Sequence, residues 1–332
     1  MWFLFALICL LGWGFADLFY KKGANENDTQ SHLKTAVWVG LVMGICAFVM
    51  MPFSESNFSL INIVKYSPAS LSYIISMVIG YAGLRYLELS IISPVQNSSG
   101  ALSAIIMSIY FVIVGDINAI TDETGFTFIS SDMSTIEIIN DILIIVGILA
   151  IVGGVIGLAV IEKKLADKEI AEKKLKVERK YKLGALALLF PLLYCLFDTI
   201  GTAADGIILD EETGLGLGEI DVLILYGLTF LAAGIICWLY MLIKNKRPYN
   251  PFSELTKGVA AVFEEFGQIF YVYAMAAKPV LAAPMIASYC IVSVILSKLI
   301  LKEKLTKSQY AVVFIVILGI VMLGISEGIG EM

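Results

Sequence analysis

Long apolar segments alternate with short polar connections along almost the whole chain. Ten of these segments are predicted to be helices, because each approaches the roughly 20 residues that a helix needs to cross a bilayer core. Their predicted ranges are residues 2–20, 35–51, 71–91, 95–114, 142–161, 183–208, 222–243, 258–277, 280–301 and 310–325. Unbroken apolar runs favour helices over the alternating strands of a barrel. The pattern predicts an all-α integral membrane protein with ten transmembrane helices.

The composition agrees with a chain that lipid solvates. Of the 332 residues, 59% are hydrophobic and 16% are charged, whereas soluble domains carry about a quarter charged residues. The five cysteines lie far apart in apolar segments, without a CxxC pair, and are interpreted as packing residues. His32 is the single histidine, so neither a histidine metal site nor a Ser-His-Asp triad is expected within the membrane. No metal or cofactor is predicted.

Basic residues are concentrated in alternate connections. Odd-numbered connections, counted from the N-terminus, hold nearly all the lysine and arginine, and the even-numbered ones contain only Lys65 and Lys278. The positive-inside rule therefore predicts that both termini lie outside the cell membrane. Because the basic residues are confined to connections, no nucleic-acid partner is indicated; the lipid bilayer is the expected surrounding.

The fifth connection divides the chain into two groups of five predicted helices. Residues 162–182 contain acid–lysine pairs at i,i+4, which predict a charged helical linker. Residues 1–161 and 183–332 would then be two repeats, and an odd number of spans per repeat inverts the second copy. Two short patterns recur in both halves: Trp13 and Asp17 match Tyr194 and Asp198 in spacing, and Tyr81 and Pro94 match Tyr271 and Pro284.

Several motifs resemble the EamA-like branch of the drug/metabolite transporter superfamily. Residues 273–279 (YAMAAKP), 283–284 (AP), 301–306 (LKEKLT) and 319–323 (GIVML) are similar to the pattern of that family's second repeat. The first half is similar through residues 11–14 (LGWG) and 93–94 (SP). The resemblance implies a ten-helix transporter with a substrate cavity between the repeats. It also implies cytoplasmic termini; we favour the charge pattern, which belongs to this chain and extends over every connection.

Charged residues within the predicted spans are the first candidates for a site, because a charge at membrane depth is costly unless it faces a bundle interior or a wet cavity. Asp198 lies about 15 residues, or roughly 22 Å, into its predicted helix. Asp17 and Asp205 lie near helix ends, where they are expected to reach interfacial water.

Polar residues on the eighth predicted helix form a stripe. Glu264, Gln268 and Tyr271 follow one another at i, i+4 and i+7, so they either line a cavity or tie helices together. Glu265 points about 100° away from Glu264 and cannot share its narrow face.

The third and fourth predicted helices contribute further candidates. Arg85 and Glu88, at i,i+3, either neutralise each other or hold a substrate carboxylate. Asn97 belongs to a polar cluster, residues 96–99, that either binds substrate or packs helices. The candidate substrate-binding residues are Trp13, Tyr81, Arg85, Asn97, Tyr194, Asp198, Glu264, Gln268, Tyr271 and Tyr289.

The preferred interpretation is a secondary transporter that exports a small organic metabolite by alternating access. Acids among aromatics suit an amine and Arg85 suits a carboxylate, which together favour an amino acid or amine. Antiport with a proton, exchange with a counter-substrate and facilitated movement are all compatible. A lipophilic-cation or drug exporter and a non-transporting scaffold are the alternatives.

An enzyme is not predicted. The chain has no GxxxxGK[ST] loop for ATP, and the glycine run at residues 214–219 (GLGLGE) lacks the aspartate that an intramembrane aspartyl protease needs.

Overall fold

The computed structural model describes residues 1–25, 27–54, 60–87, 89–114, 135–172, 189–210, 214–215, 217–302 and 305–330, and every regular element in these ranges is helical. The long helices are α1 (Trp2–Gly23), α2 (Ser31–Met50), α3 (Leu60–Gly83), α7 (Thr135–Glu172), α8 (Leu189–Leu209), α9 (Glu219–Asn245), α10 (Leu255–Ala277) and α13 (Lys307–Gly330). The shorter ones are α4 (Leu89–Gln96), α5 (Ser99–Val114), α11 (Pro279–Ala287) and α12 (Tyr289–Leu296), with single turns η1 (Met51–Phe53), η5 (Pro251–Glu254) and η6 (Ser297–Leu301).

Eight stretches of the described chain are long and apolar enough to cross a membrane. This finding confirms an all-α, multi-pass membrane protein. The predicted segments at residues 95–114 and 258–277 are not among the eight. The first is divided into two short helices, and α10 is made more polar by Glu264, Glu265 and Gln268.

Two segments that were predicted as continuous helices are divided. The predicted helix 95–114 is α4 and α5 with a break after Gln96, and the predicted helix 280–301 is α11, α12 and η6 with a break at Ser288. At each break a side chain donates a hydrogen bond to a carbonyl that also accepts from a backbone N–H group. Asn97 Nδ2 donates to Ser93 O at 2.8 Å, and Ser288 Oγ donates to Met285 O at 2.5 Å. The polar cluster at residues 96–99 therefore comprises the end of α4, the break and the first residue of α5.

Two further boundaries differ from the predictions. Because α3 begins and ends earlier than expected, Arg85 lies in the turn after the helix and not within it. Its predicted pairing with Glu88 stays a prediction. Glu88 itself is outside the described residues. α7 continues to Glu172 and so includes the first half of the predicted linker 162–182; the remainder of that linker lies outside the described residues.

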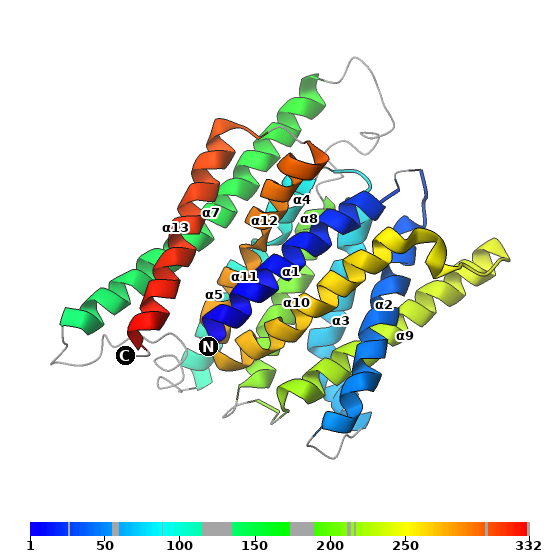
Figure 1. The fold of residues 1–332 in the computed structure, drawn as a ribbon, viewed down its shortest axis with the longest axis horizontal. Helices are drawn as coiled ribbons and strands as arrows, with labels where there is room; N and C mark the ends of the chain where they lie inside the picture. The colour runs from blue at the N-terminus through cyan, green and yellow to red at the C-terminus, as the bar shows by residue number, and fades with distance from the viewer. Residues whose placement is uncertain are drawn as a thin grey trace.

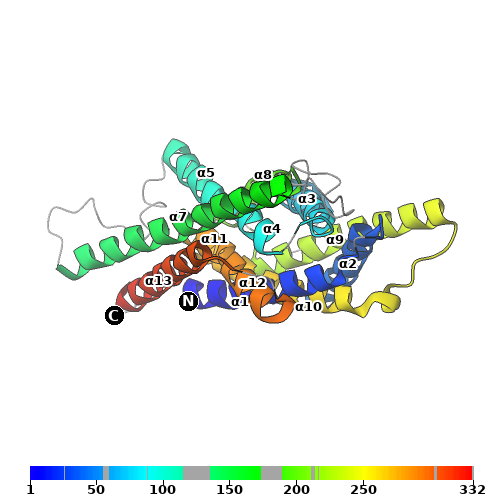
Figure 2. The same ribbon diagram turned by 90° about the horizontal axis from the view of Figure 1, so that it is seen from above.

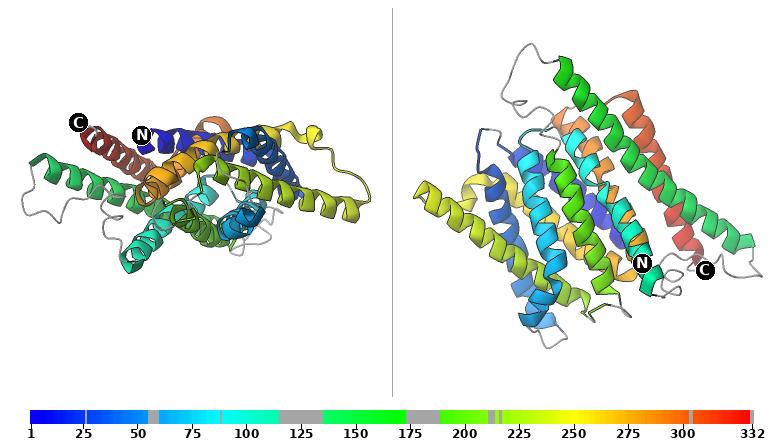
Figure 3. Two further views of the ribbon diagram at one scale, coloured as in Figure 1. Left: turned by 90° about the horizontal axis from the view of Figure 1, so that it is seen from below. Right: turned by 180° about the vertical axis from the view of Figure 1, so that it is seen from behind.

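The helices pack in pairs that are distant in sequence. The most extensive contacts join α1 with α10, α2 with α9, α3 with α8, α7 with α13, and α5 with α11. One face of the bundle shows α1 beside α10 (Figure 1), and the opposite face shows α3 beside α8 (Figure 3). The view from above shows α7 and α13 extending to one side of the bundle (Figure 2). Both termini lie at the same end of the bundle (Figure 1).

The α7–α13 pair depends on a close approach at Gly154. A Cβ atom there would lie 2.2 Å from Val316 Cγ2, whereas a Cβ at the adjacent Gly153 would meet nothing within 4 Å. Gly154→Leu is expected to lower the free energy of unfolding by about 1–3 kcal/mol through overpacking. Gly153→Leu, with the same change in helix propensity, should leave it unchanged or slightly higher. Thermal unfolding in detergent measures both, and equal melting temperatures for the two variants would contradict the packing.

Candidate functional site

Two adjoining pockets lie between α1, α3, α8, α10 and the two divided helices. The Asp198 pocket and the Asp17 pocket, named after the aspartate that each contains, share four aromatic walls: Trp13, Tyr73, Tyr194 and Tyr289. The space open to the centre of a water molecule is about 20 Å³ in each. That volume holds water but no organic molecule, so a substrate can enter only if the surrounding helices move apart.

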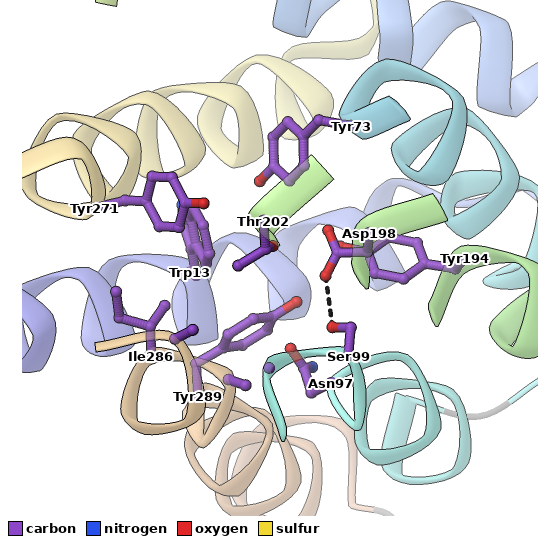
Figure 4. A pocket seen from close by; sticks show the side chains of 13 residues that line it. Trp13, Tyr73, Asn97, Ser99, Tyr194, Asp198, Thr202, Tyr271, Ile286 and Tyr289 are labelled. Atoms are coloured by element: carbon purple, nitrogen blue, oxygen red, sulfur yellow. Dashed lines mark hydrogen bonds between the residues drawn. The ribbon is translucent and has the colours of Figure 1, made fainter. Parts of the chain in front are cut away.

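The Asp198 pocket joins α8 to the broken fourth segment. Asp198 is 8% exposed, and its Oδ2 accepts a hydrogen bond from Ser99 Oγ at 2.6 Å. Figure 4 shows Ser99 and Asn97 beside the break, with Tyr289 and Tyr271 across the pocket from Tyr194. The pocket therefore places one buried carboxylate among aromatic rings.

The Asp17 pocket contains two carboxylates, of which Glu264 is buried and Asp17 is half-buried. Asp17 Oδ2 accepts hydrogen bonds from Ser93 of α4 at 2.6 Å and from Ser293 of α12 at 2.7 Å. Glu264 Oε1 accepts from Tyr73 at 2.9 Å. Asp17 thus ties α1 to both divided helices, and Glu264 ties α10 to α3. Asp17 lines this pocket and is half-buried, so its expected contact with interfacial water stays a prediction.

Trp13 forms the wall between the pockets. Its indole Nε1 donates to the Glu264 carbonyl at 3.1 Å, and its ring stacks on Tyr271 with centroids 5.2 Å apart. Tyr289 contacts it edge-on at 5.7 Å. A Cβ at Gly267 would lie 2.2 Å from the Trp13 ring, so only glycine permits this approach of α1 to α10.

The charged side chains that line the two pockets are all carboxylates. Among the described residues, no lysine or arginine forms an ion pair with Asp17, Asp198 or Glu264. Nor does the described part of the chain place three His, Cys, Asp or Glu side chains where they could hold a metal ion. Glu265 lies away from the pockets and contacts Cys46 of α2, as its predicted direction implies. The site therefore offers carboxylates and aromatic faces to a ligand.

Most of the candidate residues from the sequence line these pockets. Trp13, Tyr194 and Tyr289 line both; the others in one pocket or the other are Tyr81, Asn97, Asp198, Glu264 and Tyr271. Arg85 and Gln268 lie outside both. Arg85 donates to the Asn25 carbonyl at 3.3 Å and to the Thr29 carbonyl at 3.4 Å, which fixes it to the first connection. A substrate-binding role for any of these residues stays a prediction.

Tyr73 was not predicted as a site residue, although a signal for it exists. It lies on the buried face of α3 with Tyr66, Ser70, Met77 and Tyr81, at helical spacing. The predicted third helix begins at residue 71, so it omits Tyr66 and Ser70 and contains only part of this stripe.

A second buried carboxylate cluster lies deeper along α8. Asp205 accepts hydrogen bonds from Tyr66 at 2.5 Å, from Tyr271 at 2.8 Å and from Tyr226. Asp205 is 1% exposed, so the expectation that it reaches interfacial water is wrong. The cluster joins α8 to α3, α9 and α10 at one end of the bundle.

An ionic cluster holds the opposite end, where α10 begins. Glu254 pairs with Lys257 at 2.5 Å and with Lys34 at 2.7 Å, and Lys34 also pairs with Asp28 at 2.6 Å. Burial alone raises the pKa of Glu254, but the hydrogen bonds from Lys257 and Lys34 outweigh it and lower that pKa. The pKa of Asp28 is also lowered. Burial alone would raise it, but hydrogen bonds from Lys34 and from the Gln30 backbone outweigh that effect. Polar contacts thus join helices at both ends of the bundle.

These features define a multi-pass helical membrane protein with an enclosed acidic and aromatic site. Residues 213–325 match the model of the EamA-like transporter family, which supports membership of the drug/metabolite transporter superfamily and confirms the resemblance. That family is a family of transporters and not of enzymes.

Solved structures agree on the fold. Fourteen chains match, and one of them, from a crystal structure described only as that of a protein, has a TM-score of 0.54 at 12% sequence identity. The alignment covers 97% of this chain and 96% of that one. At this identity the likeness shows the fold alone. No curated protein matches the chain.

Proposed function

We propose that the protein is a secondary transporter that exports a small organic amine or amino acid across the cell membrane by alternating access. The observation that carries the proposal is the set of carboxylates among aromatic walls: Asp198 and Glu264, which are buried, and Asp17, which is half-buried. Because no basic side chain of the described residues pairs with them, a cationic group of a substrate would supply the missing charge. The match to a transporter family supports the same class of function.

The helix pairing supports two inverted repeats of five spans, residues 1–161 and 183–332, joined by the linker 162–182. A two-fold relation between the repeats would exchange helices in five sets: α1 with α8, α2 with α9, α3 with α10, α5 with α11 and α7 with α13. This exchange converts the pair α1–α10 into the pair α8–α3. The same exchange leaves α2–α9, α5–α11 and α7–α13 as pairs. Such a pattern is expected of a two-fold relation, and counting each divided segment as one span gives ten spans. The site lies where the two repeats meet.

Alternating access gives the two polar clusters a role. The Asp205 cluster and the Glu254 cluster close opposite ends of the bundle, and neither pocket has room for an organic molecule. In the proposed cycle, one cluster opens while the other stays closed, and substrate reaches the carboxylates from one side at a time.

Flux in proteoliposomes tests the proposal. A panel of radiolabelled amino acids, amines and lipophilic cations is compared between the native chain, Glu264→Gln and Asp198→Asn. Loss of saturable flux in either folded variant supports the site. Asp221→Asn is the matched control, because this buried carboxylate on α9 accepts a hydrogen bond from Ser54 and lines neither pocket.

The panel also separates the alternatives. Flux of lipophilic cations alone favours a drug exporter, because the aromatic walls suit such compounds as well. No flux of any compound by the folded native chain would argue for a scaffold.

A further inference from the structure

Two hydrogen-bonded links join α3 to α10 at different depths. At one level Tyr73 of α3 donates to Glu264 of α10 at 2.9 Å. At the other, Tyr66 of α3 and Tyr271 of α10 both donate to Asp205. As residue numbers rise along α3 they fall along α10, so the two helices run in opposite directions. Long side chains connect them at both levels, and the Tyr226 ring of α9 packs against Tyr66 and Tyr73.

Ser70 and Gln268 each lie between the two links along their own helix, and the depth between the links is called the layer. Ser70 lies between Tyr66 and Tyr73 on one face of α3, and Gln268 lies between Glu264 and Tyr271 on one face of α10. Ser70 is 0% exposed and Gln268 is 1% exposed. Neither Ser70 Oγ nor the Nε2 and Oε1 atoms of Gln268 have a hydrogen-bond partner in the described chain.

Three unpartnered polar atoms in one buried layer indicate bound water. A buried donor or acceptor without a partner is strongly unfavourable, and native structures avoid it. A buried water typically makes about three hydrogen bonds to such groups. Water in this layer would satisfy the serine hydroxyl and the glutamine amide together, and would lie between the carboxyl groups above and below it.

We propose that water bound between Ser70 and Gln268 connects Glu264 to Asp205 and carries a proton between these two carboxyl groups. The inference rests on the proposed transport function, and it names the proton as the species that is exchanged for substrate. As the O–H bond of the donor carboxyl breaks, an O–H bond to water forms. The water then releases one proton to the second carboxylate, so water is regenerated and one proton has moved.

Titratable side chains from several helices surround both carboxyl groups of this path. Tyr66, Tyr226 and Tyr271 surround Asp205 from α3, α9 and α10. Around Glu264, the groups are Cys9 and Asp17 of α1, Tyr73 and Tyr81 of α3, Asp198 and Tyr194 of α8, Glu265 of α10 and Tyr289 of α12. A path of water between Asp205 and Glu264 would extend from the closed end of the bundle to the Asp17 pocket.

The test separates proton movement from substrate movement in proteoliposomes. The probes are trapped pyranine for protons and, for substrate, whichever radiolabelled amino acid or amine the native chain transports. Ser70→Ala is expected to reduce substrate-driven proton flux about tenfold, the effect of one lost hydrogen bond on a rate. Substrate–substrate counterflow should change less than twofold, since Ser70 lines neither pocket.

Ser76→Ala is the matched control. Ser76 is on the same helix and equally buried, but its hydroxyl already donates to the Tyr73 carbonyl at 2.7 Å. Both fluxes should stay native in this variant. Gln268→Met removes the other two polar atoms of the layer and is expected to reduce proton flux at least as much as Ser70→Ala.

Three results would overturn the path. Native proton flux in Ser70→Ala and Gln268→Met would show that the layer carries no proton. An equal loss of proton flux and counterflow in Ser70→Ala would show a structural role only. Substrate flux without proton flux in the native chain would leave the transporter and remove the path, whereas no flux of any substrate would remove both.

Discussion

Asp205→Leu is expected to lower the free energy of unfolding by about 3 kcal/mol or more, because three buried hydroxyl groups lose their acceptor at once. Tyr66, Tyr226 and Tyr271 come from three different helices and all donate to this carboxylate. Leucine has the same branched shape with larger methyl groups in place of the oxygens, and it accepts no hydrogen bond. The loss would therefore loosen the contacts of α8 with α3, α9 and α10 together.

Single tyrosine variants provide the graded comparison for Asp205→Leu. Tyr226→Phe removes one donor and leaves the carboxylate with two, so it should cost about 1 kcal/mol. Asp205→Asn keeps one acceptor oxygen and should fall between the two variants. Chemical unfolding in detergent, followed by tryptophan fluorescence, gives all three values. If Asp205→Leu costs no more than Tyr226→Phe, the cluster does not hold this end of the bundle.

The environment of Asp205 shows where prediction from the sequence stops. Asp205 lies near the end of its predicted helix, and this position predicts contact with interfacial water. Distance from the helix end is a sound guide to water contact for an isolated helix. In the bundle, α3, α9 and α10 extend beyond it and bury it. Those neighbours are far away in sequence, so no local pattern reports them.

The apolar segments themselves were predictable, because lipid requires long runs of apolar residues and the charged connections separate them. The divided segments were not. The run at residues 96–99 is polar, but neither it nor Ser288 shows from hydropathy where a helix ends. At the two breaks the side chains of Asn97 and Ser288 bond to the carbonyls of Ser93 and Met285. Such hydrogen bonds are a local choice that hydropathy does not contain.

The candidate site was predicted in part for a physical reason. Acids at membrane depth are costly in lipid, so they gather inside the bundle, and eight of the ten candidates line the two pockets. Arg85 is not in the site because α3 ends at Gly83, and its guanidinium instead contacts the first connection. Asp17 is not among the predicted site residues because its partners, Ser93 and Ser293, come from two other segments that are distant in sequence.

Asp17→Asn is expected to reduce substrate flux by about 10- to 100-fold, since a hydrogen bond to a charged group contributes about 1.5–3 kcal/mol. One oxygen of the carboxylate accepts hydrogen bonds from the hydroxyl groups of Ser93 and Ser293, and so links α1 to both divided helices. Asparagine removes the negative charge and one acceptor oxygen while the volume stays the same. Initial uptake rates of the transported compound in proteoliposomes measure the effect.

Controls for Asp17→Asn separate its charge from its hydrogen bonds. Ser293→Ala keeps the carboxylate but removes one donor, so a small loss in this variant and a large one in Asp17→Asn would assign the effect to charge. Asp221→Asn, a buried carboxylate outside both pockets, should transport like the native chain. If Asp17 and Asp198 are equivalent positions of two repeats, Asp17→Asn and Asp198→Asn should reduce flux by similar factors. A folded Asp17→Asn protein with native uptake would show that this carboxylate does not contact the substrate and that its link between the divided helices does not limit transport.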